Sequence, residues 1–205
     1  MSFCLNFPLF MIVASLICSV VSTLLNHKFS RYLSLLLSFC CVVLNATLFV
    51  YVLKSEQSFV YLMGHFPHPW GNELKIGPLE NLISLIFSLV LFLILLGGKE
   101  ILNDKLSVDK HNFYYSLCDL INASLLVLAY TNDIFTAYVF VEICTLASTG
   151  ILVIKDDGKS IVAGLRYMVF ALIGSGMLLF GIVFILASYN FRNGYFTLLW
   201  FFNFR

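Results

Sequence analysis

Long apolar runs separated by short polar segments make up most of the 205-residue chain. Each run has 18 or more residues, enough for a helix to cross the roughly 30 Å hydrocarbon layer of a bilayer. The pattern predicts an all-α, polytopic membrane helix bundle within residues 1–188, with about six transmembrane helices at residues 8–25, 31–53, 79–96, 113–130, 134–154 and 161–188. We expect residues 189–205 to form an aromatic-rich tail that is too short to span.

The polar segments predict the orientation of the helices. The links after the first, third and fifth runs carry seven Lys and Arg residues, and the N-terminus, the other links and the tail carry four. Because basic residues are retained on the cytoplasmic side, we expect the N-terminus outside. The segment Lys54–Pro78 is rich in proline and glycine, which predicts an irregular loop.

Composition narrows the class of protein. The chain is 60% hydrophobic and 11% charged, with a formal net charge of +1, which places it in a lipid bilayer and gives no support to nucleic-acid binding. The six cysteines show no Cys-x-x-Cys spacing, and Pro67 spoils the helical spacing of His65 and His68, so neither set predicts a metal site. No phosphate loop, dinucleotide fingerprint or catalytic constellation is present, so we expect neither a cofactor nor an enzyme.

The fifth run holds the strongest candidate for chemistry, Glu142. This carboxyl group lies near the middle of an apolar span, where an ionised side chain costs on the order of 3 kcal/mol or more to insert. Tyr138, Thr145 and Thr149 follow it at helical spacing and share its face. The pattern indicates a polar stripe that faces protein or water; the alternative is a glutamate that only hydrogen-bonds neighbouring helices.

Two further charged residues lie inside predicted spans. Asp119, with Asn122 three residues on, is placed about 9 Å into the fourth span by the helical rise, and we rank it below Glu142 because it lies nearer an end. Arg166 lies one to two turns inside the sixth span and must reach the headgroups, pair, or face a wet cavity. Glu142, Asp119, Tyr138, Thr145, Thr149 and Arg166 are therefore the candidate residues of an ion pathway.

Two segments resemble a known family. These are YLMGHFPHPWGNELKIGPLENLISLIFSLV and NDIFTAYVFVEICTLASTGILV, the second followed by VAGLRYMVFALIGSGMLLFGIVFIL. They are similar to the N-terminal half of the antiporter-like, proton-conducting subunits of respiratory complex I, Mrp-type sodium/proton antiporters (most closely their D subunit) and energy-converting hydrogenases. The resemblance implies that Glu142 is the fifth-helix carboxylate of an ion path whose protonation is coupled to a lysine on a later helix.

The resemblance also carries departures. Arg166 stands where family members usually have Lys, and arginine does not release its proton at accessible pH, which argues against a relay there. Gly77 stands where many members have Asp. Family members have about fourteen helices, so we expect a truncated or split subunit.

Three functions follow as alternatives. The first is a subunit that contributes to an H⁺ or Na⁺ pathway, together with other membrane subunits, in the plasma membrane of a bacterium or archaeon. The second is a non-conducting structural or assembly subunit, and the third, an enzyme in its own right, has little support. The pattern leaves open whether redox chemistry or an ion gradient drives the transport.

Overall fold

The structure, a computed structural model, describes residues 6–55, 58–62, 73–98, 102 and 106–192. This part of the chain holds six helices long and apolar enough to cross a membrane, which confirms the predicted fold class. They are α2 (Phe7–Leu24), α3 (His27–Ser55), α4 (Pro78–Gly97), α6 (Val108–Tyr130), α7 (Ile134–Val153) and α8 (Gly158–Arg192).

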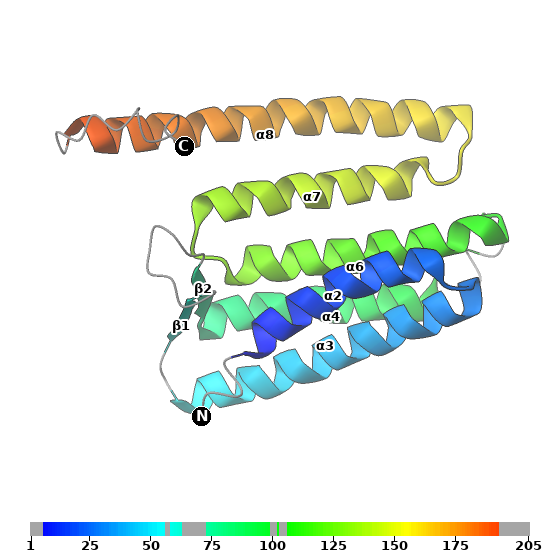
Figure 1. Cartoon of the computed structure of the whole chain (residues 1–205), viewed down its shortest axis with the longest axis horizontal. Coiled ribbons are helices and arrows are strands. Elements are labelled where there is room, and N and C mark those ends of the chain that lie inside the picture. The colour runs from blue at the N-terminus through cyan, green and yellow to red at the C-terminus, as the bar shows by residue number, and fades with distance from the viewer. Residues whose placement is uncertain (1–5, 56–57, 63–72, 99–101, 103–105, 193–205) are drawn as a thin grey trace, which may run out of the picture.

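The helices form a four-helix bundle with two helices added to one side. Helices α2, α3, α4 and α6 pack against one another, α7 packs on α6, and α8 packs on α7 (Figure 1). Helix α6 is the centre of the assembly, because 61% of its spanning window is buried, against 11% for α7 and for α8. Much of the surface of the last two helices therefore has no partner among the described residues.

A short β-hairpin covers one end of the bundle. Strand β1 (Phe59–Leu62) pairs antiparallel with β2 (Glu73–Ile76), and Asn132 donates a backbone hydrogen bond of 2.9 Å to the carbonyl of Glu73. The prediction of an irregular loop throughout residues 54–78 was therefore wrong for the two strands. The proline- and glycine-rich residues 63–72 lie outside the described residues, as do His65 and His68.

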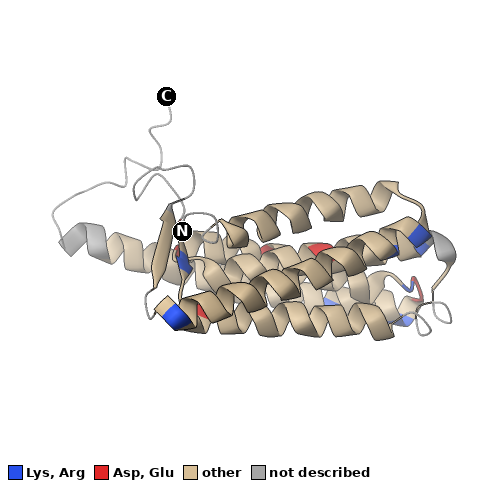
Figure 2. Ribbon diagram, turned by 90° about the horizontal axis from the view of Figure 1, so that it is seen from below, with Lys and Arg blue, Asp and Glu red and all other residues tan. Residues whose placement is uncertain are grey.

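Local sequence explains where the later helices begin. Asp133 caps α7, because its carboxylate accepts hydrogen bonds from the backbone N–H groups of Phe135 and Thr136. Asp156 adopts the left-handed backbone conformation, with φ 59°, in the tight turn between α7 and α8, and it forms an ion pair of 3.1 Å with Lys110. Figure 2 shows that most charged residues lie toward the ends of the helices.

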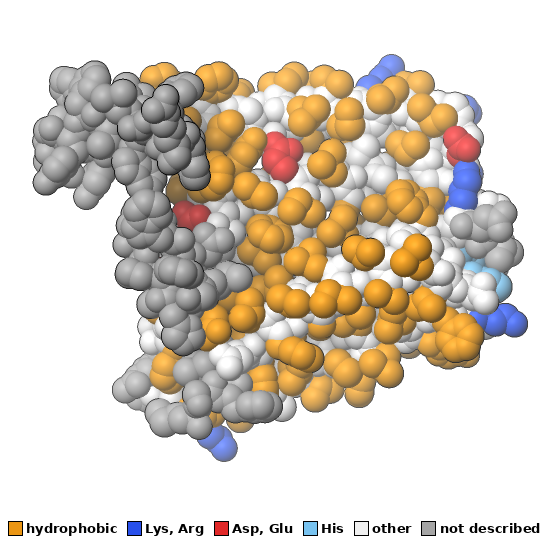
Figure 3. All heavy atoms as spheres, in the orientation of Figure 1, with side chains coloured by type: hydrophobic (Ala, Val, Ile, Leu, Met, Phe, Trp, Pro, Cys, Tyr) orange, Lys and Arg blue, Asp and Glu red, His pale blue; other side chains and the backbone are white. Residues whose placement is uncertain are grey.

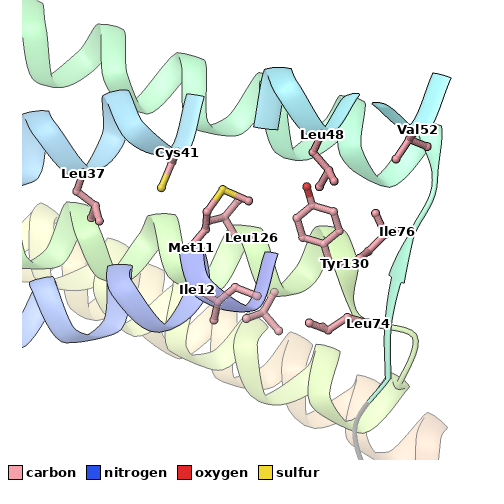
Figure 4. Close-up of a cluster of buried hydrophobic side chains, with 11 residues drawn as sticks. Met11, Ile12, Leu37, Cys41, Leu48, Val52, Leu74, Ile76, Leu126 and Tyr130 are labelled. Atoms are coloured by element: carbon pink, nitrogen blue, oxygen red, sulfur yellow. The ribbon is translucent and has the colours of Figure 1, made fainter. Parts of the chain in front are cut away.

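Apolar residues fill the end of the bundle under the hairpin and cover the outside of the molecule. One buried cluster joins α2, α3 and α6 to the hairpin through Met11, Leu48, Leu126, Ile76 and Tyr130 (Figure 4). The outer face shown in Figure 3 is mostly hydrophobic, as expected of helices surrounded by lipid.

The aromatic-rich tail predicted from residue 189 is only partly described. Helix α8 continues to Arg192, and residues 193–205 lie outside the described residues. The division into a bundle and a tail therefore remains a prediction.

Candidate functional site

Glu142 lies on α7, and the residue is half-buried. The phenol group of Tyr138, one turn earlier, lies close enough to interact electrostatically with it. These two side chains form the polar pair that the sequence spacing predicted on this face of the helix.

The two threonines of the same stripe do not bind the carboxyl group. Thr145 donates its hydroxyl to the backbone carbonyl of Glu142, at 2.9 Å, and Thr149 donates to the carbonyl of Thr145, at 2.8 Å. Both hydroxyl protons are therefore taken up by the helix itself, while the oxygen atoms can still accept a hydrogen bond.

Arg166 is not brought to either carboxyl group. It lies on α8 with an exposed side chain, and the ion pairs within the described residues include neither Arg166 nor Glu142. Within this part of the chain, Glu142 has Tyr138 as a partner but no cationic one.

Asp119 occupies a different site, inside the four-helix bundle. It is fully buried, and its Oδ2 atom accepts hydrogen bonds from Ser34 on α3, at 2.7 Å, and from Ser22 on α2, at 3.2 Å. The expectation that Asp119 lies near a helix end was wrong. Helix α6 begins at Val108 rather than near Phe113, so Asp119 is equally far from its first and last residues.

Further serine and asparagine side chains line the same interior. Asn122 donates its amide to Ser15 at 3.2 Å, and Ser19 donates to the carbonyl of Ser116 at 3.0 Å. Serines recur at helical spacing along the buried faces of α2 and α3, at Ser15, Ser19, Ser22, Ser30, Ser34 and Ser38. Hydrogen bonds between these helices therefore hold the interior together, as is common in membrane bundles.

A second buried network was missed from the sequence. Tyr130 donates to Asn45, at 2.9 Å, and also bonds Asn81 and Ser84; Asn45 in turn donates to Ser88 at 3.1 Å. These residues are uncharged and lie in otherwise apolar runs, so none of them taken singly predicts a buried hydrogen-bond network. The helical spacing of Asn81, Ser84 and Ser88 was the available clue.

Comparisons with known proteins show which family and which proteins this chain is similar to. Residues 131–202, which include all of α7, match the family described as NADH:quinone oxidoreductase/Mrp antiporter, transmembrane. The chain is 28% identical over 187 residues to an uncharacterized protein of Methanocaldococcus jannaschii, covering 90% of this chain and 37% of that protein.

Two relatives have functional names. One is NADH-quinone oxidoreductase subunit N of Desulforudis audaxviator, 26% identical over 89% of this chain and 36% of the relative. The other is the D subunit of the Na(+)/H(+) antiporter of Bacillus subtilis, 26% identical over 61% of this chain and 25% of the relative.

The fold also matches a solved structure. A chain of the membrane-bound sulfane sulfur reductase, an archaeal respiratory membrane complex, superimposes with a TM-score of 0.78 and 22% identity, over 88% of this chain and 37% of that one. The bundle with its six spanning helices is thus that of a multi-span membrane protein.

Residues 131–202 and the named relatives thus show that the chain is similar to antiporter-like subunits of multisubunit respiratory and antiporter complexes. The chain spans a little over a third of the length of the first relatives that it matches.

Proposed function

We propose that this chain contributes the carboxyl group of Glu142 to an H⁺ or Na⁺ pathway in a multisubunit membrane complex. The observation that carries the proposal is the position of Glu142: a half-buried glutamate in the interior of a spanning helix, next to the phenol of Tyr138 and without a cationic partner among the described residues. A carboxyl group held at this depth is a functional candidate by default.

The chemistry available there is the binding and release of one cation. The carboxyl group can hold a proton, or it can hold Na⁺ with the help of neighbouring oxygen atoms, because carboxylate and hydroxyl oxygens suit hard cations. Tyr138 supplies a hydroxyl that can donate to the ionised carboxylate or accept from the protonated acid. Thr145 and Thr149 place two more oxygen atoms on the same face of α7.

The orientation and surroundings belong to the same proposal. The basic links place the N-terminus outside the plasma membrane of a bacterium or archaeon, and other membrane subunits complete the path. In this arrangement Arg166 is a fixed positive charge near the lipid headgroups, because its guanidinium group does not exchange its proton.

The alternative is a non-conducting structural or assembly subunit, and one observation bears on it. Gly174 and Gly181 on α8 have open space around the position of a side chain, so this row of small residues has no partner among the described residues. Such a row permits close approach of another helix. Packing against a further membrane helix is compatible with both functions, and the chemistry of Glu142 distinguishes them.

A carbodiimide that modifies protonated carboxyl groups in apolar surroundings tests the proposal on native membranes. We expect mass spectrometry to find the adduct on Glu142, with labelling that falls as pH rises. Protection by Na⁺ at constant pH would identify Na⁺ as the ion, and its absence would identify H⁺. A Glu142 that is never labelled, or is labelled independently of both pH and Na⁺, would contradict the proposal. Glu80, at the start of α4 and paired with Lys75, is the matched control.

A further inference from the structure

Asp119 and Asn122 each present one buried oxygen atom that lacks a partner among the described residues. These atoms are Asp119 Oδ1 and Asn122 Oδ1. Both side chains are at most 1% exposed, and they lie three residues apart on one face of α6. A buried polar atom without a hydrogen-bond partner destabilises the folded state. We therefore expect a hydrogen-bond donor for these two oxygens.

A single proton bound to Asp119 provides the missing donor. Ser22 and Ser34 both donate to Oδ2 of Asp119, which leaves Oδ1 as the oxygen that carries the proton of the neutral acid. Two acceptors cannot bond each other, but a protonated Oδ1 can donate to Asn122 Oδ1, either directly or through one water molecule.

The lack of a cationic partner for Asp119 among the described residues also favours the neutral acid. The titratable side chains that interact with Asp119 are Cys18 from α2, Cys41 from α3 and Cys118 from α6. The ion pairs of the described residues do not include Asp119. An ionised carboxylate with no cation beside it is costly in a buried position.

A row of polar atoms leads from Asp119 to one end of the bundle. The other buried side-chain atoms without partners in the described residues are Ser30 Oγ, Arg31 Nε, His111 Nε2 and Asn112 Oδ1. Ser30 lies one turn before Ser34 on α3, and His111 lies about two turns before Asp119 on α6. Buried water molecules typically bind to polar atoms that lack a partner in the protein, so water can link Asp119 to this end of the bundle.

The opposite direction leads through a largely apolar layer. Leu126 lies one turn beyond Asn122 on α6, and Met11 of α2 packs beside it; both are at most 1% exposed (Figure 4). Asn122 also donates to Cys41 Sγ, at 3.7 Å, and Asn45 follows one turn later on α3. Apart from those of Asp119 and Asn122, the unpartnered side-chain atoms of the described residues all lie toward the Ser30–His111 end, so this is the end from which we expect water to enter.

From these contacts we infer that Asp119 is a second proton-binding site, built from α2, α3 and α6, separate from the Glu142 face of α7, and filled from the end of the bundle at Ser30 and His111. In the filled state the proton resides on Asp119 Oδ1 and is shared toward Asn122. This inference does not depend on the proposed role of Glu142.

Isotope-edited infrared spectroscopy tests the inference on the full chain in lipid nanodiscs. Among the aspartates that the structure describes, only Asp119 lies in the interior of a spanning helix. Labelling the side-chain carboxyl carbon of aspartate with ¹³C separates its signal from that of Glu142. We expect a carboxylic-acid C=O band at neutral pH that shifts with the label, disappears in Asp119→Asn and persists in Glu142→Gln. Absence of a label-sensitive acid band would overturn the inference, as would its loss on addition of Na⁺.

The route is tested by hydrogen–deuterium exchange of the same band. Transfer to D₂O should shift the band, and the shift should be slowed several-fold by Ser30→Val. Ser88→Val, in the network beyond the apolar layer, is the matched control and should leave the rate unchanged. Slowing by Ser88→Val but not by Ser30→Val would overturn the inferred direction of access. Far-UV circular dichroism checks that each variant is folded.

Discussion

Ser34 donates a hydrogen bond of 2.7 Å to Asp119, joining α3 to the centre of α6 across 85 residues of sequence. Ser22 of α2 donates to the same carboxylate oxygen. One buried carboxyl group thus ties three helices together. The first helices of the chain are therefore held by polar contacts of a kind that the described residues of the α7–α8 pair do not form.

Ser34→Ala should destabilise the bundle by about 1–3 kcal/mol, the range for a buried hydrogen bond to a carboxyl group whose partner is removed. Unfolding in a denaturing detergent, followed by circular dichroism, measures the change. Thr47→Ala is the matched control, because the exposed Thr47 hydroxyl bonds only to the backbone carbonyl of Leu44 in its own helix. Equal stability of the two variants would show that Ser34 contributes nothing measurable.

Tyr130→Phe should also destabilise the protein by about 1–3 kcal/mol, because it removes the phenol proton that the buried oxygens of Asn45 and Asn81 share and leaves them only the Ser84 hydroxyl as a donor within this network. The same unfolding assay applies. Tyr51→Phe serves for comparison: this ring is half-buried and stacks on Phe59, so losing its hydroxyl should have little effect. A neutral Tyr130→Phe would mean that the asparagine network does not need its phenol.

At Gly164, α8 lies close against α7. A Cβ atom added there would collide with the side chain of Val153, whereas one added at Gly174 meets nothing. Gly164→Val should therefore cost about 1–3 kcal/mol through overpacking, and Gly174→Val should be neutral in the isolated chain. Disulfide trapping between cysteines placed on α7 and α8 would report the change in packing. A stronger effect of Gly174→Val in the isolated chain would contradict this arrangement of α8.

Asp157, just before α8, gives a pH dependence outside the spans. Hydrogen bonds from the side chain and the backbone N–H of Ser160, together with Lys155, lower its pKa to about 2. A carboxylate with a lowered pKa stabilises the fold above its unfolded pKa of about 4, and this contribution is lost as pH falls toward the folded value. The stability difference between wild type and Asp157→Ala should be constant above about pH 5 and shrink between about pH 4 and pH 2. Denaturant titrations across that interval measure it; a difference that grows on acidification would contradict the assignment.

The sequence predicted the presence of the spanning helices better than it predicted the segments between them or the position of polar residues within them. Hydropathy detects spans because length and apolar content suffice, but it placed the start of α6 near Phe113 rather than at Val108. Lys110, His111 and Asn112 continue the helix without being apolar, and this error made Asp119 look peripheral. The hairpin was not predicted, because the pairing of Phe59 with Ile76 is a non-local contact and no local sequence pattern records it.

The candidate site was predicted in part. Charge inside an apolar run marked Glu142 and Asp119, and helical spacing placed Tyr138 beside Glu142. Spacing alone did not show that Thr145 and Thr149 bond backbone carbonyls of their own helix. A threonine hydroxyl can donate to a backbone or a side-chain acceptor, and the three-dimensional surroundings decide which. The partners of Asp119 lie 85 residues or more away in the sequence, and only packing reveals them.

Ion movement in the assembled membrane complex tests the role of Glu142 most directly. Glutamine keeps the size and hydrogen bonding of Glu142 but carries no exchangeable charge. Proteoliposomes of the complex with Glu142→Gln should therefore contain the chain in normal amount yet show no coupled H⁺ or Na⁺ flux. Glu80→Gln, in the same assay, should retain flux. Undiminished flux in Glu142→Gln would contradict the account and leave this chain a structural role.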